Sequence, residues 1–209
     1  MRLLLVIAIL AGFIYVMKGD DPGDMQGKVS TTLSNFLPVL KHTDDGAIRN
    51  RGLTRTPDDA AVQMASSPDG HAEELVLDVI DSAKSELDVA AYEFTDRRIA
   101  EHLIARAHDG VAVRIVLDRS QLTGQGSKLQ MVAAAGIPVR IDTAVPRMHN
   151  KLIVADRENT QTGSMNYTEA GAHQNAENVI VVWHHRGNAE QARAMWMRLW
   201  NESKPYQAG

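Results

Sequence analysis

Two short segments decide the fold class of this chain: His149-Asn150-Lys151-Leu152-Ile153-Val154-Ala155-Asp156 and Gly163-Ser164-Met165-Asn166. They have the spacing H-x-K-x4-D and G-S-x-N, so five polar residues fall within 18 positions of an apolar region. The run from Leu152 to Ala155 is typical of a strand that fills a core. Polar residues at the ends of such a strand contribute little to the core, so their presence indicates a function rather than stability.

The spacing has a geometric consequence, because residues two apart in a strand point to the same face. His149 and Lys151 should project together, and Ser164 and Asn166 form a second such pair if their segment is extended. Together they offer an imidazole, a cation, a hydroxyl and an amide. Such a set can grip a phosphate while a nucleophile attacks its phosphorus, with Lys151 and Asn166 on the non-bridging oxygens and His149 as nucleophile or acid.

At these residues the chain resembles the phospholipase D superfamily, whose signature is H-x-K-x4-D followed by G-S-x-N. The likeness covers about Val62 to Trp200. Within the superfamily, the chain is similar in particular to small bacterial exported endonucleases that have a single motif. It includes four further segments: Glu74 to Ser85, Ala91 to Thr95, Gly110 to Asp118, and Asn175 to Asn178. The resemblance implies a mixed-sheet α/β sandwich of the phospholipase D type and phosphodiester chemistry.

The remaining motif residues receive distinct expected roles. Glu177, which matches the superfamily's acidic residue at the start of the next strand, is expected to orient an imidazole, as acids do in triads; the alternative is a strand-end surface acid. Ser164 is expected to fix the loop or the phosphate by hydrogen bonds. Asp156 lies seven residues past His149, too far along an extended strand to reach the phosphate easily, so we expect a structural role in the turn.

A single motif has a consequence for assembly. No other histidine is followed by lysine two positions later, yet the chemistry wants one imidazole to attack phosphorus and another to protonate the leaving oxygen. The resemblance implies the same arrangement. We therefore expect a homodimer with the site on its two-fold axis, where one His149 forms a phosphohistidine and the other acts as acid and then as base.

Composition narrows the class of protein. The length of 209 residues suits one domain with appendages. The formal charge of -4 argues against a protein that coats nucleic acid nonspecifically. A local basic cleft could be formed by Arg119, Arg140, Arg147 and Lys151, although the three arginines also fit ordinary surface positions. Cysteine is absent, which excludes disulfides and a cysteine zinc site. No metal-ligand cluster is apparent, so we expect a metal-independent reaction without a cofactor, in which Lys151 replaces the cation.

The N-terminus has the pattern of an export signal. Leu3 to Met17 is apolar behind Arg2, short for a membrane span, and no A-x-A cleavage site follows. We expect residues 1–18 to be a signal peptide or signal anchor, 19–60 a linker and 61–203 the phospholipase D-like catalytic domain. The protein would then be periplasmic or anchored in the bacterial inner membrane facing the periplasm, with membrane contact through residues 3–17.

Within the catalytic domain, strands and helices alternate, which indicates an α/β sandwich with a mixed sheet. The predicted strands cover about Ala61–Ala65, Leu87–Phe94, Val111–Leu117, Val139–Ile141, the motif strand, Thr160–Gly163 and a strand from Glu177. The first predicted helix follows the turn at Ser66 to Gly70 and ends at about Lys84. Three more are predicted: Asp96 to Ala107, capped by Thr95, then Ser127–Ala135 and Asn188–Asn201. Helical spacing places Trp196, Leu199 and Trp200 in the core.

Three functions agree with these residues. The first is a nonspecific endonuclease acting on DNA or RNA, which the single motif and short chain favour. The second is a phospholipase D acting on membrane phospholipid, for which the same catalytic set would serve. The third is a membrane-tethered nucleic-acid-binding module without turnover, which the intact His149, Lys151, Ser164 and Asn166 disfavour. The motif reads a phosphate and not what it carries, so the substrate stays open.

Overall fold

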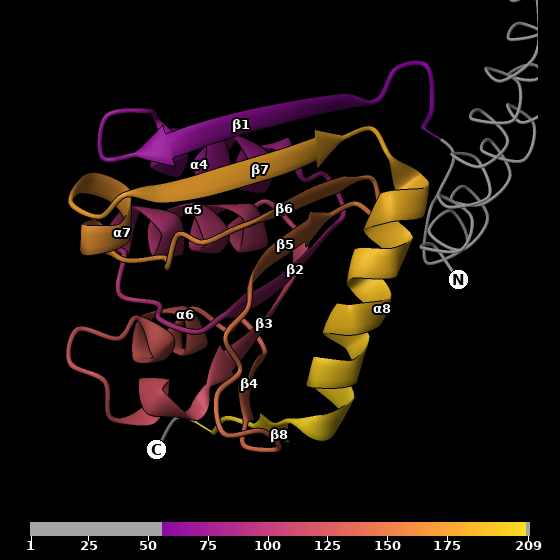
Figure 1. The fold of residues 1–209 in the computed structure, drawn as a ribbon. Coiled ribbons are helices and arrows are strands. Elements are labelled where there is room, and N and C mark those ends of the chain that lie inside the picture. The colour runs from indigo at the N-terminus through magenta and orange to yellow at the C-terminus, as the bar shows by residue number, and fades with distance from the viewer. Residues whose placement is uncertain (1–55, 208–209) are drawn as a thin grey trace, which may run out of the picture. The chain divides into compact units, whose positions relative to one another are not determined.

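A mixed sheet of eight strands forms the centre of the computed structural model, which describes residues 56–207 (Figure 1). The spatial order is β1-β7-β6-β5-β2-β3-β4-β8; β2, β3 and β4 are parallel and every other neighbouring pair is antiparallel. The strands are β1 (Ala61–Ser67), β2 (Glu86–Ala91), β3 (Ala112–Asp118), β4 (Val139–Asp142), β5 (Lys151–Ala155), β6 (Asn159–Gly163), β7 (Glu177–Trp183) and β8 (Lys204–Pro205). The predicted signal segment and most of the predicted linker lie outside the described residues.

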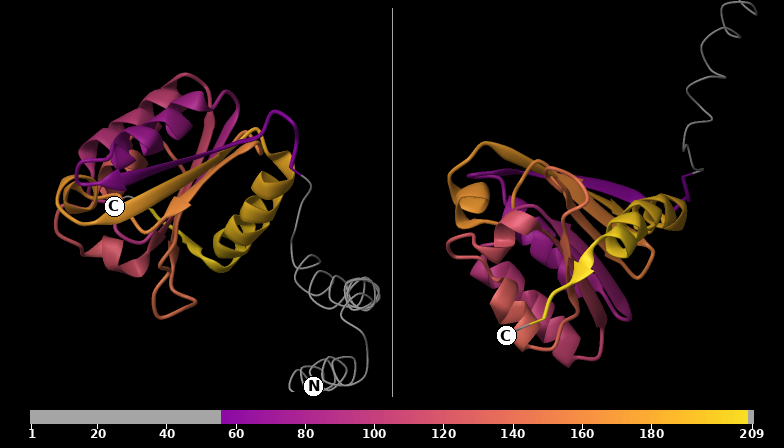
Figure 2. Two further views of the ribbon diagram at one scale, coloured as in Figure 1. Left: turned by 45° about the horizontal axis from the view of Figure 1, so that its top comes forward. Right: turned by 90° about the horizontal axis from the view of Figure 1, so that it is seen from below.

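Helices cover both faces of this sheet (Figure 2). They are α4 (Ala72–Ser82), α5 (Arg97–His108), α6 (Leu129–Ala134), α7 (Glu169–His173) and α8 (Arg186–Glu202), with a 3-10 turn η1 (Arg119–Leu122). The face under α4, α5 and α6 holds the larger apolar core, while α8 packs over the other face around Ala90, Val116, Leu152 and Val154. The central strands are thus buried on both faces, which explains their continuous apolar runs.

The predicted mixed-sheet α/β sandwich is confirmed, and most elements lie within a few residues of their predicted bounds. Two local predictions were wrong. The predicted strand Leu87–Phe94 ends at Ala91, because the next residues leave the sheet toward the motif loops. The cap of α5 is Asp96 rather than Thr95, since the Asp96 side chain accepts a hydrogen bond from the Ile99 amide at 3.0 Å. The short elements η1, α7 and β8 escaped prediction.

One part of the sheet stays open on the α8 face. This helix lies over β2, β4, β5 and β6, whereas β1 is an edge strand beyond its reach. Val62 and Met64 of β1 are 72% and 67% exposed, and they pair with the half-buried Val182 and Ile180 of β7. Apolar side chains therefore form a surface here. Among residues 56–207, none of the helices has the length and apolar character needed to cross a membrane.

Candidate active site

The histidine and lysine of the motif meet at the start of β5. Lys151 is the first residue of this strand, and its Nζ lies 3.2 Å from both the Nδ1 and the Nε2 atoms of His149. The His149 side chain is exposed, while Lys151 is only 5% exposed. The site thus presents an accessible imidazole backed by a largely buried ammonium group, an arrangement suited to an anion that arrives from solvent.

Neighbouring strand ends hold the imidazole in place. The ring of Tyr92, which follows β2, lies 4.4 Å from the His149 ring between centroids. The Tyr92 amide donates to the Asn150 carbonyl at 3.0 Å, and the Met148 amide donates to Asp118 Oδ2 at 2.8 Å. Asp118 ends β3. The ends of β2 and β3 therefore fix the segment on both sides of His149.

The G-S-x-N segment follows β6 and is locked against the start of β7. The Ser164 amide donates to the Asn178 carbonyl at 3.0 Å, and the Asn178 amide donates to Ser164 Oγ at 3.0 Å. A Cβ atom on Gly163 would lie 2.2 Å from the Asn178 carbonyl oxygen, so a side chain cannot fit there without a shift. Glycine is required because β6 and β7 approach so closely at this point.

Ser164 also joins the loop to Glu177. Its hydroxyl donates to one carboxylate oxygen of Glu177, and the Asn175 side-chain amide donates to the other at 3.3 Å. Ser164 thus fixes the loop, which is one of the two roles expected from the sequence. Among the described residues, the Glu177 carboxylate bonds to Ser164 and Asn175 rather than to the imidazole of the same chain. Orientation of an imidazole by Glu177 therefore stays a prediction.

Glu93 is a site residue that the sequence reasoning missed. It follows Tyr92 at the end of β2 and accepts a hydrogen bond from Asn166 Nδ2 at 2.8 Å. Burial lowers the pKa of Lys151, and the negative charges of Glu93 and Glu177 oppose that change. The signal was available, since the apolar run ending at Ala91 is followed directly by Tyr92 and Glu93. Polar residues in that position lie beside the site when the strand pairs with the motif strand.

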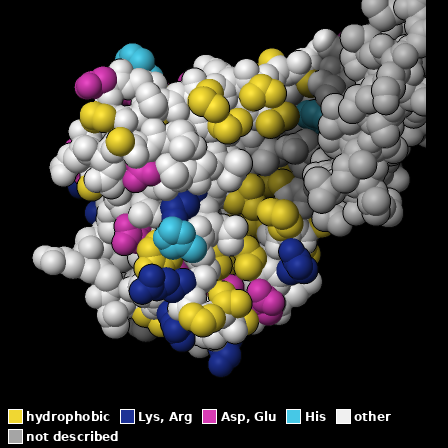
Figure 3. Space-filling model, viewed as in Figure 1, with side chains coloured by type: hydrophobic (Ala, Val, Ile, Leu, Met, Phe, Trp, Pro, Cys, Tyr) yellow, Lys and Arg dark blue, Asp and Glu magenta, His cyan; other side chains and the backbone are white. Residues whose placement is uncertain are grey.

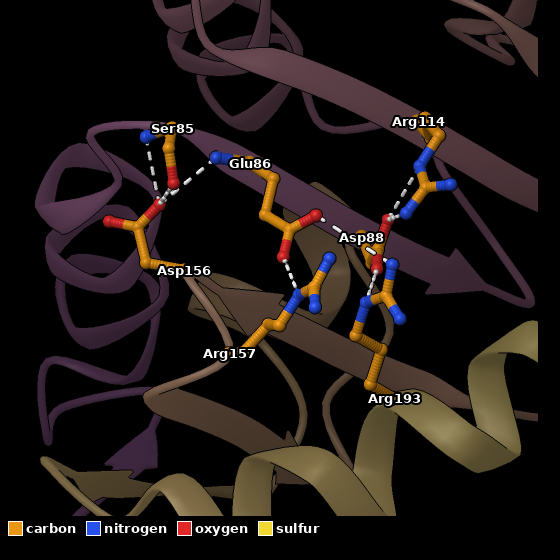
Figure 4. Close-up of polar contacts among 7 residues, drawn as sticks. All are labelled: Ser85, Glu86, Asp88, Arg114, Asp156, Arg157 and Arg193. Atoms are coloured by element: carbon orange, nitrogen blue, oxygen red, sulfur yellow. Dashed lines mark hydrogen bonds and ion pairs between the residues drawn. The ribbon is translucent and has the colours of Figure 1, made fainter.

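Asp156 follows β5, at the opposite end of the strand from His149. Its carboxylate points toward Ser85 (Figure 4). Asp156 and Arg157 have φ values of 54° and 55°, in the left-handed region, and form the turn into β6. The Asp156 carboxylate accepts hydrogen bonds from the Lys84, Ser85 and Glu86 amides and from the Ser85 hydroxyl, at 2.7 to 3.0 Å. These contacts fasten the turn to the start of β2.

The four candidate cations of the cleft lie in different surroundings. Arg119 and Arg147 are exposed, and Arg119 Nη2 donates to the Pro146 carbonyl at 2.9 Å, three residues before His149. Arg140 instead donates to Ser203 and lies 5.2 Å over the Trp200 ring, so of the two positions left open for it, the structure supports packing against α8 rather than a place in the cleft. On the face seen in Figure 3, lysine and arginine side chains gather around a histidine side chain.

Other candidates from the sequence have structural roles. Trp196 is fully buried and donates from Nε1 to the Val89 carbonyl at 2.8 Å, so its predicted place in the core is confirmed. Trp200 stacks on it with ring centroids 5.0 Å apart. Within residues 56–207, no group of three or more histidine, cysteine, aspartate or glutamate side chains is placed to hold a metal ion.

Comparisons with known proteins agree with this geometry. Residues 76–200 match the family model described as cardiolipin synthase, PLD-like domain. A phospholipase D from Rickettsia conorii is 38% identical over 177 residues, which cover 84% of each chain. A mitochondrial cardiolipin hydrolase from Mus musculus is 28% identical over 173 residues, covering 81% of this chain and 76% of that protein. The crystal structure of Nuc from Salmonella typhimurium, a phospholipase D family member, superposes with a TM-score of 0.69 at 39% identity and covers 72% of this chain and all of that one.

The fold and the paired motifs define a domain built for phosphodiester chemistry. This chain belongs to the phospholipase D superfamily, as both the family model and the relatives show. It is therefore a phosphodiester hydrolase of that superfamily, and the proteins that it resembles include one named Nuc and others named phospholipase D.

Proposed function

We propose that this protein is a metal-independent endonuclease that cleaves DNA or RNA without sequence preference. The observation that supports this most directly is the exposed His149 ring, with Lys151 Nζ 3.2 Å away at the base of the site. Similarity to Nuc over the whole length of that chain favours nucleic acid as the substrate. Two exposed arginines near the site, Arg119 and Arg147, suit a polyanionic strand.

The reaction proceeds in two displacements. A ring nitrogen of His149 attacks phosphorus, an N–P bond forms and the P–O bond to the leaving group breaks. His149 of the partner subunit gives its proton to that oxygen. It then takes a proton from water, whose oxygen attacks phosphorus and breaks the N–P bond. Lys151 and the second N–H of the Asn166 amide stabilise the charge on the non-bridging oxygens in both steps.

The second imidazole requires a second copy of the chain. The open apolar surface formed by Val62, Met64, Ile180 and Val182 supports this assembly, because an exposed apolar sheet face of this kind is typical of an interface (Figure 3). The shared site further requires that the two His149 side chains meet at the two-fold axis of the dimer.

Mixing two forms of the protein tests the shared site. Inactive His149→Ala protein is added to the wild type under conditions of subunit exchange, and activity is measured per wild-type chain. A shared site predicts a fall to about half at equal amounts, because half of the wild-type chains then pair with a mutant. Constant activity per wild-type chain would show that each chain holds a complete site.

Phospholipid is the second candidate substrate. Relatives named phospholipase D and mitochondrial cardiolipin hydrolase favour it, and a membrane segment at residues 3–17 would bring the site to the bilayer. The same catalytic residues would act on either diester, so activity on each must be compared directly.

The deciding assay measures both activities side by side. Plasmid DNA, single-stranded RNA and vesicles containing cardiolipin or phosphatidylcholine are offered to the full chain in excess EDTA. We expect cleavage of nucleic acid, undiminished by the chelator, since Lys151 provides the positive charge. Cleavage of lipid alone would establish the phospholipase instead, and loss of activity restored by a divalent ion would contradict the metal-independent mechanism.

A further inference from the structure

Glu93 lies between the two halves of the motif without belonging to either. Its side chain accepts the hydrogen bond from Asn166 Nδ2 at 2.8 Å, and its backbone carbonyl accepts one from the Tyr167 amide at 3.2 Å. The preceding residue, Tyr92, contacts His149 through its ring. The two residues that follow β2 therefore contact both the H-x-K segment and the G-S-x-N loop.

The carboxylate determines which way the Asn166 amide faces. An ionised carboxylate only accepts hydrogen bonds, so the NH2 group of Asn166 must turn toward Glu93 and the amide oxygen away from it. That oxygen, Oδ1, is buried and has no hydrogen-bond partner among the residues that the structure describes. Glu93 is thus the side chain that selects the amide orientation, with one N–H engaged and the other left for a phosphate oxygen.

Glu93 also contributes to the charge balance around Lys151. Lys151 is 5% exposed, and its ammonium nitrogen lies 3.2 Å from the His149 ring nitrogens and 5.3 Å from the centroid of the Tyr92 ring. The negative charges of Glu93 and Glu177 raise the pKa of Lys151 against the effect of burial. A buried cation without a counter-charge tends to lose its proton. Of the two carboxylates, Glu177 accepts from Ser164 and Asn175, whereas Glu93 accepts from the phosphate-binding amide itself.

We propose that Glu93 is a positioning residue for phosphodiester hydrolysis: it aims the Asn166 amide and supplies negative charge to the part of the site that holds Lys151. The proposal rests on the phosphodiester chemistry of the site and is independent of whether nucleic acid or lipid is the natural substrate. It separates Glu93 from an ordinary strand-end acid, which would be solvated and without a fixed partner.

Two substitutions divide the two roles. Glu93→Gln removes the charge but keeps an amide oxygen that can accept from Asn166, whereas Glu93→Ala removes both. Glu101→Gln is the matched control, because Glu101 is exposed on α5 and pairs with Arg97 outside the site. The full chain is assayed with bis(p-nitrophenyl) phosphate, a small diester that needs neither a base nor a lipid to be recognised.

The pH profile of kcat/KM gives the first readout. Without the Glu93 charge, burial acts on Lys151 with less opposition, so its pKa falls and activity on the alkaline side should be lost at lower pH. Glu93→Gln and Glu93→Ala should both move the alkaline limb in this direction, and Glu101→Gln should leave it in place. A merely structural role for Glu93 would not move this limb.

The size of kcat gives the second readout. At neutral pH, Glu93→Ala should lower kcat about tenfold, because the Asn166 amide loses the acceptor that orients it. Glu93→Gln should retain most of the wild-type kcat, because glutamine still offers an acceptor oxygen. An unmoved alkaline limb in both variants, or no recovery by glutamine with melting temperatures equal, would overturn the proposal. Failure of the wild type to cut DNA or RNA while it hydrolyses the small diester would reject the nuclease assignment alone, since the Glu93 comparison would still be measurable.

Discussion

The two ends of strand β5 carry one sequence motif and do opposite work. At its start, His149 is exposed to solvent and Lys151 is buried, and this burial lowers the pKa of the Lys151 ammonium group. At its end, Asp156 accepts four hydrogen bonds from Lys84, Ser85 and Glu86. The start of β5, which we propose is the catalytic end, therefore keeps the His149 ring accessible to a substrate, whereas at the structural end the protein itself provides the hydrogen bonds to Asp156.

The surroundings of the structural end extend the contrast (Figure 4). Arg157 pairs with Glu86, the first residue of β2, and the buried Asp88 pairs with Arg114 and with Arg193 of α8. Burial raises the pKa of Asp88, and the two arginines oppose this. This network ties α8 and the β5–β6 turn to β2, the strand whose other end delivers Tyr92 and Glu93 to the active site. The ion pairs at the start of β2 thus help to hold the strand that positions Tyr92 and Glu93 beside His149.

The largest expected effect is at the catalytic end. His149→Ala should reduce turnover by about 10^4-fold or more, because it removes the nucleophile and its protonating counterpart together. The side chain is exposed, so the melting temperature should stay within a few degrees of the wild type. His108→Ala, an exposed histidine at the end of α5, is the control. Near-full activity in His149→Ala would remove the covalent mechanism.

Lys151→Met should have the next largest effect. Loss of the charge that stabilises the non-bridging oxygens should cost about 2.7–4 kcal/mol in the transition state, or about 100- to 1000-fold in kcat/KM. Methionine keeps most of the buried stem, and burial no longer opposes a charge, so stability should be equal or higher. Lys84→Ala, at the structural end, is the matched control. A stability loss that accounts for the missing activity would contradict this assignment.

The comparison also explains what the sequence could predict. Buried runs such as Val113–Leu117 and Leu152–Ala155 specify strands by their apolar character, so the mixed sheet followed from pattern alone. The spacing H-x-K brought His149 and Lys151 to one face for the same reason. Glu93 was missed because its role depends on Asn166, 73 residues away, and pairing between distant segments leaves no periodic trace. The position of Arg140 stayed open because only the fold reveals that its guanidinium group lies over the Trp200 ring.

A smaller effect on activity is expected at the structural end. Asp156→Ala should keep kcat within about twofold at 25 °C, since Asp156 lies at the far end of the strand from His149. It should lower the free energy of unfolding by about 2–4 kcal/mol, because three backbone amides and a hydroxyl lose their acceptor. Urea denaturation measures the change, with Glu158→Ala in the same turn as control. A large loss of kcat in fully folded Asp156→Ala protein would place the whole motif in catalysis.

The smallest expected effect is the pH dependence of that stability. Burial, the largest single influence, raises the pKa of Asp156, but the hydrogen bonds from Glu86, Ser85 and Lys84 outweigh it and hold the pKa below its ordinary value of 3.8. A carboxylate whose pKa is lower in the folded state stabilises the fold above its unfolded pKa, and loses this contribution as pH falls through the folded pKa.

Asp156→Asn isolates this charge, because asparagine keeps the shape of the side chain in the turn. The difference in unfolding free energy between wild type and Asp156→Asn should be constant from about pH 7 to pH 5 and shrink below the ordinary carboxylate range. Urea titrations at a series of pH values measure it. A difference that persists unchanged at the lowest pH where the protein folds would mean that shape, rather than charge, anchors this end of β5, and the electrostatic half of the contrast between the two ends would be wrong.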